Sequence, residues 1–200
     1  MPFERLAYLY RSFLIGLALS ALTLGVAKAD DIRPPVKSHA DTYSESEMVV
    51  EAGKVFGGTA KGLADVVHSV FQKYGEPNAF IKGEEASGAF VLGLRYGVGT
   101  LVMKNGTTEK VYWQGPTAGW DFGGNAVKVF TLIYNLPDGS QIYQRFPGVE
   151  GSAYLIAGIG VNYQQRGNII LAPMRAGAGL RLGASVGYLK YTTSREWLPF

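Results

Sequence analysis

The 200-residue sequence contains no cysteine and only two histidines. The lack of cysteine excludes disulfide bonds, a thiolate nucleophile and cysteine-based zinc sites. His39 and His68 both lie in the first half of the chain, so Ser-His-Asp chemistry is not expected in the second half. No cluster has metal-ligand spacing, and we expect no enzyme activity, metal or cofactor. A carboxylate pair for glycan hydrolysis, Asp121 with Glu150, is the alternative, although turn and ion-pair roles fit these residues better.

Long apolar runs are scarce as well, and the main one is short. Residues 12–26 are apolar, follow Arg5 and Arg11, and precede an A-x-A motif that ends at Ala29. This order predicts a secretory signal peptide over residues 1–29, cleaved after Ala29. A membrane anchor is the alternative, but a spanning helix needs about 20 apolar residues. We therefore expect an exported protein that does not span a membrane after cleavage.

The charge is small overall but unevenly distributed. The chain carries a formal charge of +3, of which +2 belongs to residues 1–29. Residues 30–85 hold six Lys/Arg and ten Asp/Glu, whereas residues 86–200 hold ten and five. Either the acidic half packs on the basic half, or the basic half meets an anionic lipid or saccharide. No nucleic-acid partner is expected.

The first part of the mature chain is predicted to be a linker followed by a helical segment. Residues 30–43 are polar and aperiodic, which is typical of a flexible linker. Ser44 and Glu47 have the spacing of a capping box, and apolar residues then recur at helical spacing as far as Tyr74. Gly57 with Gly58 should interrupt the helix. The apolar stripe predicts that the helix packs on a barrel wall or at its open end.

From Ala79 onward the sequence predicts strands almost exclusively. Of its 27 glycines, 20 lie between residues 83 and 187 among aromatic and β-branched residues, which suits a small, strongly coiled sheet. A turn is expected at Gly115-Pro116 and a hairpin at Asn105-Gly106. The expected strands are listed by range: 79–82, 87–95, 96–104, 109–114, 127–134, 141–146, 152–164, 169–174 and 188–192.

Residues 175–188 alternate strictly between apolar residues and small or cationic ones. Arg175 and Arg181 fall on the small-residue face of this pattern, and glycines on one face suit a curved wall. Together the elements predict a mainly β domain over residues 44–200. We expect a small soluble eight-stranded β-barrel preceded by a short helical segment.

Several long motifs resemble a known family. They are GPTAGWDFGG, YQRFPGVEGSAY, LAPMRAGAGLRLGASVGYLKYT and the closing Trp197-x-Pro199-Phe200. From about Ser44 to the C-terminus the chain resembles the envelope integrity protein A family of Gram-negative bacteria. The resemblance implies a periplasmic eight-stranded barrel with a role in envelope stress resistance that is linked to lipopolysaccharide. Residues 115–135 also resemble part of the SYLF lipid-binding domain, and neither resemblance supplies catalytic residues.

The candidate site is a binding cavity in the barrel. Eight-stranded barrels hold packed side chains or one small ligand. We expect arginines to hold an anionic lipid or lipopolysaccharide head group, because a buried arginine without a carboxylate partner needs an anion or water. The candidate residues are Trp113, Trp120, Phe122, Tyr134, Tyr154, Tyr163, Arg175 and Arg181. The alternative is that the aromatic residues only fill the core.

Two other functions remain open. The protein could be a purely structural partner of other envelope proteins. It could also be a small outer-membrane barrel, but Glu196 and Pro199 interrupt the last strand, and residues 127–134 do not alternate as a lipid-facing strand must.

Overall fold

The computed structural model describes residues 41–57, 62–89, 92–118, 126–150, 152–176 and 187–197. They belong to one compact unit, residues 37–200. The signal peptide and nearly all of the linker lie outside the described residues, so the predicted domain boundaries stay predictions.

The described residues form two helices, one short 3-10 helix and a sheet of ten strands. The helices are α2 (Glu45–Phe56), α3 (Leu63–Tyr74) and η1 (Gly139–Ile142). The strands are β1 (Ala79–Ala89), β2 (Leu92–Met103), β3 (Thr108–Ala118), β4 (Val127–Tyr134), β5 (Arg145–Pro147), β6 (Tyr154–Ile156), β7 (Ile159–Val161), β8 (Gln164–Arg166), β9 (Ile169–Ala176) and β10 (Tyr188–Thr192). The mainly β class is confirmed, and the sheet of the described residues has ten strands, some of them only three residues long.

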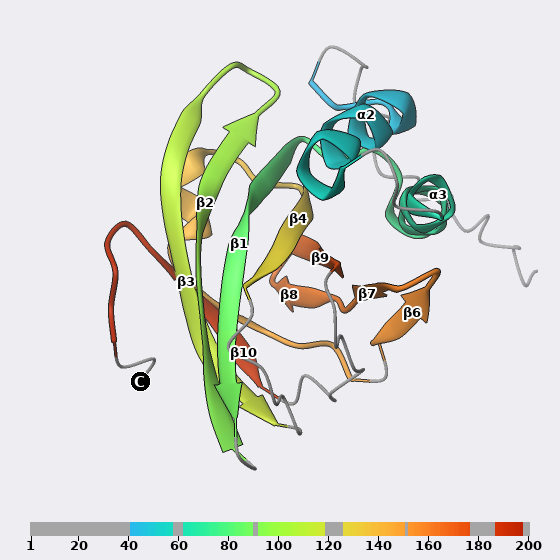
Figure 1. Ribbon diagram of the computed structural model, residues 1–200. Helices are drawn as coiled ribbons and strands as arrows, with labels where there is room; N and C mark the ends of the chain where they lie inside the picture. Colours follow the sequence, from blue (N-terminus) through green and yellow to red (C-terminus); the bar gives the residue numbers. More distant parts are fainter. Residues whose placement is uncertain are drawn as a thin grey trace, which may run out of the picture. The chain divides into compact units, whose positions relative to one another are not determined.

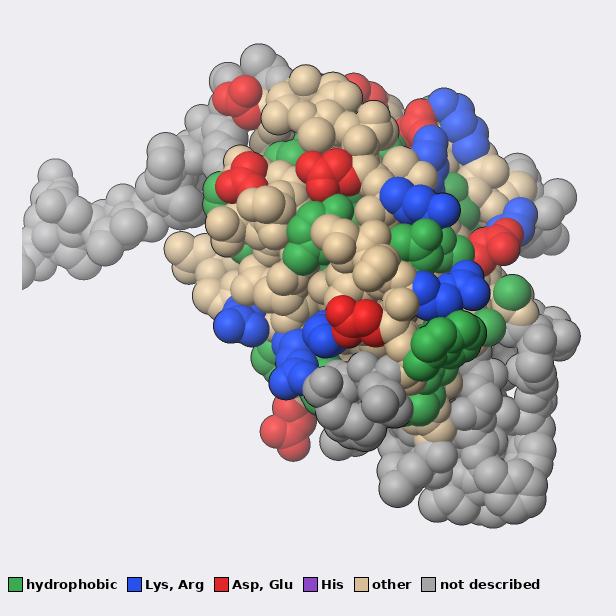
Figure 2. All heavy atoms as spheres, turned by 90° about the vertical axis from the view of Figure 1, so that its left-hand side faces the viewer, with side chains coloured by type: hydrophobic (Ala, Val, Ile, Leu, Met, Phe, Trp, Pro, Cys, Tyr) green, Lys and Arg blue, Asp and Glu red, His purple; other side chains and the backbone are tan. Residues whose placement is uncertain are grey.

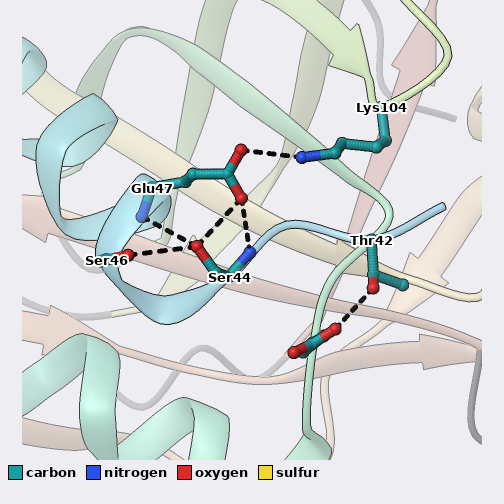
Figure 3. Close-up of polar contacts among 6 residues, drawn as sticks. Thr42, Ser44, Ser46, Glu47 and Lys104 are labelled. Atoms are coloured by element: carbon teal, nitrogen blue, oxygen red, sulfur yellow. Dashed lines mark hydrogen bonds and ion pairs between the residues drawn. The ribbon is translucent and has the colours of Figure 1, made fainter. Parts of the chain in front are cut away.

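Helix α2 begins at the predicted capping box. The Ser44 hydroxyl accepts the Glu47 N–H, and the Glu47 carboxylate accepts the Ser44 N–H (Figure 3). The same carboxylate binds Lys104 Nζ at 2.7 Å, which connects the helix to the end of β2. Lys104 and Ser44 hold the pKa of Glu47 at about 2, the bond from Lys104 being the larger cause.

Both helices end at glycines with positive φ. Gly57 follows α2 at φ 79°, and Gly75 follows α3 at φ 74°, where few other residues fit. The predicted interruption of the helical segment is therefore confirmed. Figure 1 shows the two helices side by side over one face of the sheet, next to β4.

All strand pairs are antiparallel, and the sheet order is β5-β10-β3-β2-β1-β4-β9-β7-β6, with β8 also on β9. Strands β7 and β8 share one register on β9, because Val161 pairs with Met174 and Gln164 pairs with Leu171. They are interrupted opposite Pro173, which has no N–H to donate to the ladder. An isolated antiparallel bridge between Gly148 and Gln164 connects β8 with the residue that follows β5.

The sheet separates two apolar clusters. The inner cluster fills the inside of the curl, and the helix-side cluster lies under α2 and α3. Strand β4 contributes to both, with Val129 and Ile133 inside and Phe130 and Leu132 under the helices. Residues 129–134 are all buried, and burial on both faces explains why they are apolar apart from Thr131. The helices therefore pack on the wall of the sheet.

Several predicted boundaries are wrong. Gly115 and Pro116 lie inside β3, and residues 87–95 span the end of β1 and the start of β2. Residues 141–146 begin in η1, and residues 152–164 form the β6–β7 hairpin and β8. The bounds of β4 and β10 and the Asn105-Gly106 hairpin agree with the predictions.

Candidate functional site

Trp113 of β3 lies on a floor of glycines inside the curl. A methyl group at Gly97 would lie 1.9 Å from the Trp113 ring, and methyl groups at Gly83 and Gly99 would lie 3.0 and 3.1 Å from it. Adjacent strands β1 and β2 therefore use glycine where the indole needs space. The ring is 2% exposed, so the glycines seat one large side chain inside the sheet.

The Trp113 indole donates a hydrogen bond to a buried carboxylate. Its Nε1 lies 2.8 Å from Glu85 Oε2. Arg175 Nε lies 2.9 Å from Glu85 Oε1, and Arg95 Nη1 lies 3.6 Å from the same oxygen. All four side chains are at least nine-tenths buried. We call Glu85, Arg95, Arg175, Trp113 and their neighbour Asn162 the buried charge cluster.

The cluster keeps Glu85 ionised. Burial alone would raise the pKa of this carboxyl, but the charges of Arg175 and Arg95 outweigh burial and hold the pKa at about 2. Since a buried carboxylate is costly without partners, these two guanidinium groups make the ionised form tolerable. Two cations against one anion leave the cluster with a formal charge of +1.

Two amide groups beside the cluster are not fully satisfied. Arg175 Nη1 donates to Asn162 Oδ1 at 2.5 Å, which leaves Asn162 Nδ2 without a partner among the described residues. The same holds for Gln164 Oε1. The space around Arg95, Gln164 and Leu189 is about 10 Å³, room for about one water. Among the described residues, Trp113 and the other apolar side chains of the inner cluster pack against one another inside the sheet.

An open groove lies on the opposite face of the same strands. Its volume is about 340 Å³, and it is lined mainly by even-numbered residues of β1–β3 and by the C-terminal segment. Tyr96 pairs with Gln114, and Val98 pairs with Tyr112, so these side chains are cross-strand neighbours on one face. Because Gly97 has no side chain, Trp113 of the inner cluster also borders the groove. We call it the β1–β3 groove.

The C-terminal segment forms one wall of the β1–β3 groove. Glu196 accepts bonds from Lys190 Nζ at 2.6 Å and from Gln114 Nε2 at 3.2 Å. The Tyr96 hydroxyl donates to the Trp197 carbonyl at 2.5 Å. Figure 1 shows this segment running beside β3, on a face that carries no helix. On the face shown in Figure 2, acidic and basic side chains are mixed among apolar ones.

A second groove of about 570 Å³ lies beside α2. It is lined by Tyr43, Met48 and Phe80 together with the acidic Glu47 and Glu51. The Glu47 carboxylate is already bonded to Lys104, and Glu51 to Lys54. This groove therefore offers mainly apolar surface, with Lys82 as a further charged group in its lining.

The predicted site residues that the structure describes lie in two different clusters. Trp113 and Arg175 belong to the buried charge cluster, whereas Tyr134 and Tyr163 lie in the helix-side cluster with Tyr154 at its margin. The hydroxyls of Tyr154 and Tyr163 are 2.8 Å apart, and burial raises the pKa of both Tyr134 and Tyr163. Trp120, Phe122 and Arg181 lie outside the described residues.

Arg175 differs from the expectation in one respect. We expected an arginine without a carboxylate partner, but Glu85 supplies that partner. Sequence reasoning missed Glu85, Arg95 and the groove wall around Trp197. Glu85 of β1 pairs with Gly97 of β2. This neighbour can be identified only when the register of the two strands is known.

Two further findings concern membrane-spanning helices and metal ligands among the described residues. No described helix is long and apolar enough to cross a membrane. Within the same residues, no group of three or more His, Asp or Glu side chains is placed to hold a metal ion.

The curled antiparallel sheet, with its inner apolar cluster and outer groove, defines a β-barrel-like protein. The crystal structure of a β-barrel-like, uncharacterized protein from Brucella abortus has the same fold, with a TM-score of 0.73 and 50% sequence identity. The match covers 80% of this chain and 99% of that one. The chain belongs to the envelope integrity protein A family, which matches residues 41–200. The resemblance noted in the sequence is thus confirmed. None of the curated proteins compared with the chain matches it.

Proposed function

We propose that the protein works in the periplasm, after cleavage at Ala29, and supports envelope integrity and stress resistance without catalysing a reaction. In this proposal it binds an anionic envelope amphiphile, a lipid or a lipopolysaccharide-related molecule. The name of its family supports the envelope role. The ligand is our inference from the geometry.

The observation that carries the proposal is the β1–β3 groove. Binding sites are typically concave, largely apolar, and provided with a few placed polar groups. The groove has this composition, with aromatic walls and both acidic and basic side chains at its margin. Arg195 in the lining offers hydrogen-bond donors, and Glu84 and Glu196 offer acceptors. Of the residues predicted from sequence, Trp113 borders this groove.

The buried charge cluster supports a binding protein over an enzyme. A general acid must hold a proton near neutral pH, and a general base needs a free lone pair aimed at a substrate. The pKa of Glu85 is about 2, so its carboxyl holds no proton near neutral pH. Its Oε1 accepts from Arg175 and its Oε2 accepts from Trp113. The cluster thus stabilises the sheet beneath the groove.

We also infer that the curl closes into the expected eight-stranded barrel, in the order β8-β9-β4-β1-β2-β3-β10-β5, with β6–β7 as an added hairpin. Beside the Gly148–Gln164 bridge, Val149 N–H donates to the Tyr163 carbonyl at 2.8 Å. Arg166 Nη1 donates to the Arg145 carbonyl at 3.3 Å. These bonds connect β8 with the segment at β5, and closure would protect the inner cluster from water.

The test is native mass spectrometry of the protein purified from its own periplasm, with extraction and identification of any bound lipid. We expect a co-purifying envelope amphiphile that is lost from a Tyr96→Ala, Trp197→Ala double variant. Leu155→Ala is the control, because Leu155 is an exposed apolar residue on β6. A protein that carries no lipid and binds none in titration would overturn the proposal that it binds an envelope amphiphile. The structural-partner alternative would then remain.

A further inference from the structure

We propose that the β1–β3 groove recognises an uncharged saccharide unit of the envelope molecule, stacked on Tyr96, Tyr112 and Trp197. This inference rests on the proposed function and specifies which part of the ligand the groove reads. In this proposal the aromatic residues of the groove bind sugar rings, and the acyl chains and phosphates of the envelope molecule lie outside the groove.

The aromatic rings are arranged to hold a flat, weakly polar surface. Tyr96 and Trp197 have ring centroids 5.9 Å apart at 57°, so their faces form two sides of an angle. Tyr112 stands on the neighbouring strand and lines the same groove. Aromatic faces carry negative partial charge and attract the positive C–H groups that cover one side of a sugar ring. The Trp197 side chain is 68% exposed, which is unusual for so large an apolar group and suits a stacking surface.

The polar groups of the groove match hydroxyls. A sugar hydroxyl both donates and accepts, so it needs acceptors and donors close together. Glu84 and Glu196 offer acceptors, and Arg195 offers donors. With Lys190, which bonds to Glu196, these four side chains carry a formal net charge of zero. A phosphate would therefore gain little from the groove, whereas hydroxyls can bond to both signs.

The groove is held in shape before any ligand arrives. Three hydrogen bonds fix the C-terminal wall: Lys190 and Gln114 to Glu196, and Tyr96 to the Trp197 carbonyl. Wall and floor therefore need little ordering on binding, which favours affinity for a small ligand. The volume of about 340 Å³ lies near the lower end of ligand pockets, which span roughly 300–1,000 Å³. It suits one or two sugar rings and is small for a lipid with its acyl chains.

The experiment compares sugars with an anionic lipid on the full mature chain. Cellobiose, mannobiose and N,N′-diacetylchitobiose are titrated by saturation-transfer NMR and calorimetry, in parallel with phosphatidylglycerol vesicles. We expect at least one disaccharide to bind, with saturation transferred mainly to the C–H face of the ring. Trp197→Ala and Tyr96→Ala should each weaken that binding about tenfold, which corresponds to the loss of one good stacking contact.

Two variants serve as controls, and circular dichroism checks that all variants fold. Tyr96→Phe removes the bond to the Trp197 carbonyl but keeps the ring, so it should weaken binding less than Tyr96→Ala. Leu155→Ala lies outside the groove lining and should leave binding unchanged. Equal disaccharide binding by every variant would overturn the assignment to this groove.

The lipid titration separates the two levels of the proposal. Vesicle binding without any disaccharide binding would overturn the saccharide inference and leave an amphiphile-binding protein. Binding of neither would overturn the inference and the proposed ligand together.

Discussion

At the scale of single residues, Glu85 determines how the inside of the sheet is built. Its carboxylate is nearly inaccessible to water, and it is bound by one indole and two guanidinium groups. Removing the charge of one partner leaves the remaining charges buried without compensation. The free energy of unfolding then falls by more than the intact cluster contributes to it. The cluster is therefore a position where a single substitution has a large effect.

We predict that Glu85→Gln lowers the free energy of unfolding by about 3–5 kcal/mol, because Arg95 and Arg175 would face each other without an anion. Urea unfolding monitored by circular dichroism at pH 7 measures this. Glu84→Gln, one residue earlier on the outer face, is the matched control and should change stability by about 0.5 kcal/mol or less. Equal stability of the two variants would contradict the structural role of Glu85.

The same carboxylate predicts a pH dependence. Its folded-state pKa of about 2 is below the ordinary value of 4.5. The stabilisation from ionised Glu85 is thus fully present above about pH 4.5 and is lost as the pH falls toward 2. We expect urea midpoints of the wild type to fall more steeply over this window than those of Glu85→Gln. Glu47→Gln should keep most of the wild-type slope, because Glu47 is solvent-exposed and its ion pair contributes less.

Gly97 provides a further prediction at this scale. A methyl group there would overlap the Trp113 ring, so Gly97→Ala should destabilise the protein by at least about 1–3 kcal/mol. Thermal unfolding and the tryptophan emission maximum report the effect. Gly53→Ala in α2 is the control, since no atom lies within 4 Å of its added methyl group, and it should be neutral or stabilising. Similar behaviour of the two variants would show that Trp113 is not seated as described.

At the scale of elements, local signals predicted some parts well and others badly. The capping box at Ser44, the Asn105-Gly106 hairpin and the apolar run of β4 each depend on a few neighbouring residues. The turn expected at Gly115-Pro116 is wrong because tertiary packing overrides it. A side chain at Gly115 would meet the Tyr188 carbonyl of β10, so this glycine serves strand approach and not chain reversal.

The β6–β7 hairpin was missed because its turn has an unusual residue. Ala157 adopts φ 48°, followed by Gly158 at φ 85°, where Asn-Gly is the common pair. An alanine in the left-handed region costs about 1 kcal/mol. The sequence therefore lacks the signal that the backbone requires, and residues 152–164 read as one long strand.

This turn predicts a stabilising substitution. Ala157→Gly should raise the free energy of unfolding by roughly 0.5–1 kcal/mol, because glycine adopts positive φ without the steric penalty. Ala153→Gly, at an exposed alanine without positive φ, is the control and should be neutral or destabilising. Denaturant unfolding of both variants measures the difference. Destabilisation by Ala157→Gly would indicate that the alanine side chain contributes more by packing than the turn loses by strain.

At the scale of the whole molecule, the uneven charge of the sequence is partly explained by folding. Glu85 and Glu47 from the acidic half pair with Arg175 and Lys104 from the basic half. These pairs fit the interpretation that the acidic half of the chain packs on the basic half. The candidate groove, by contrast, could not be predicted, because Tyr96, Tyr112 and Trp197 are brought together only by strand register and by the return of the C-terminal segment.

The last prediction concerns where the folded unit acts. The segment before it has a basic start, an apolar stretch of about signal-peptide length and an A-x-A motif ending at Ala29. We expect mass spectrometry of the periplasmic fraction to find a chain that begins at Asp30. Because signal peptidase requires small residues at the cleavage motif, replacing Ala27 and Ala29 by leucine should leave the full-length chain in the inner membrane. A matched change of Thr23 to leucine, within the apolar stretch, should leave processing intact. Recovery of the unprocessed wild-type chain from inner membranes would contradict cleavage after Ala29 and would favour the membrane-anchor alternative.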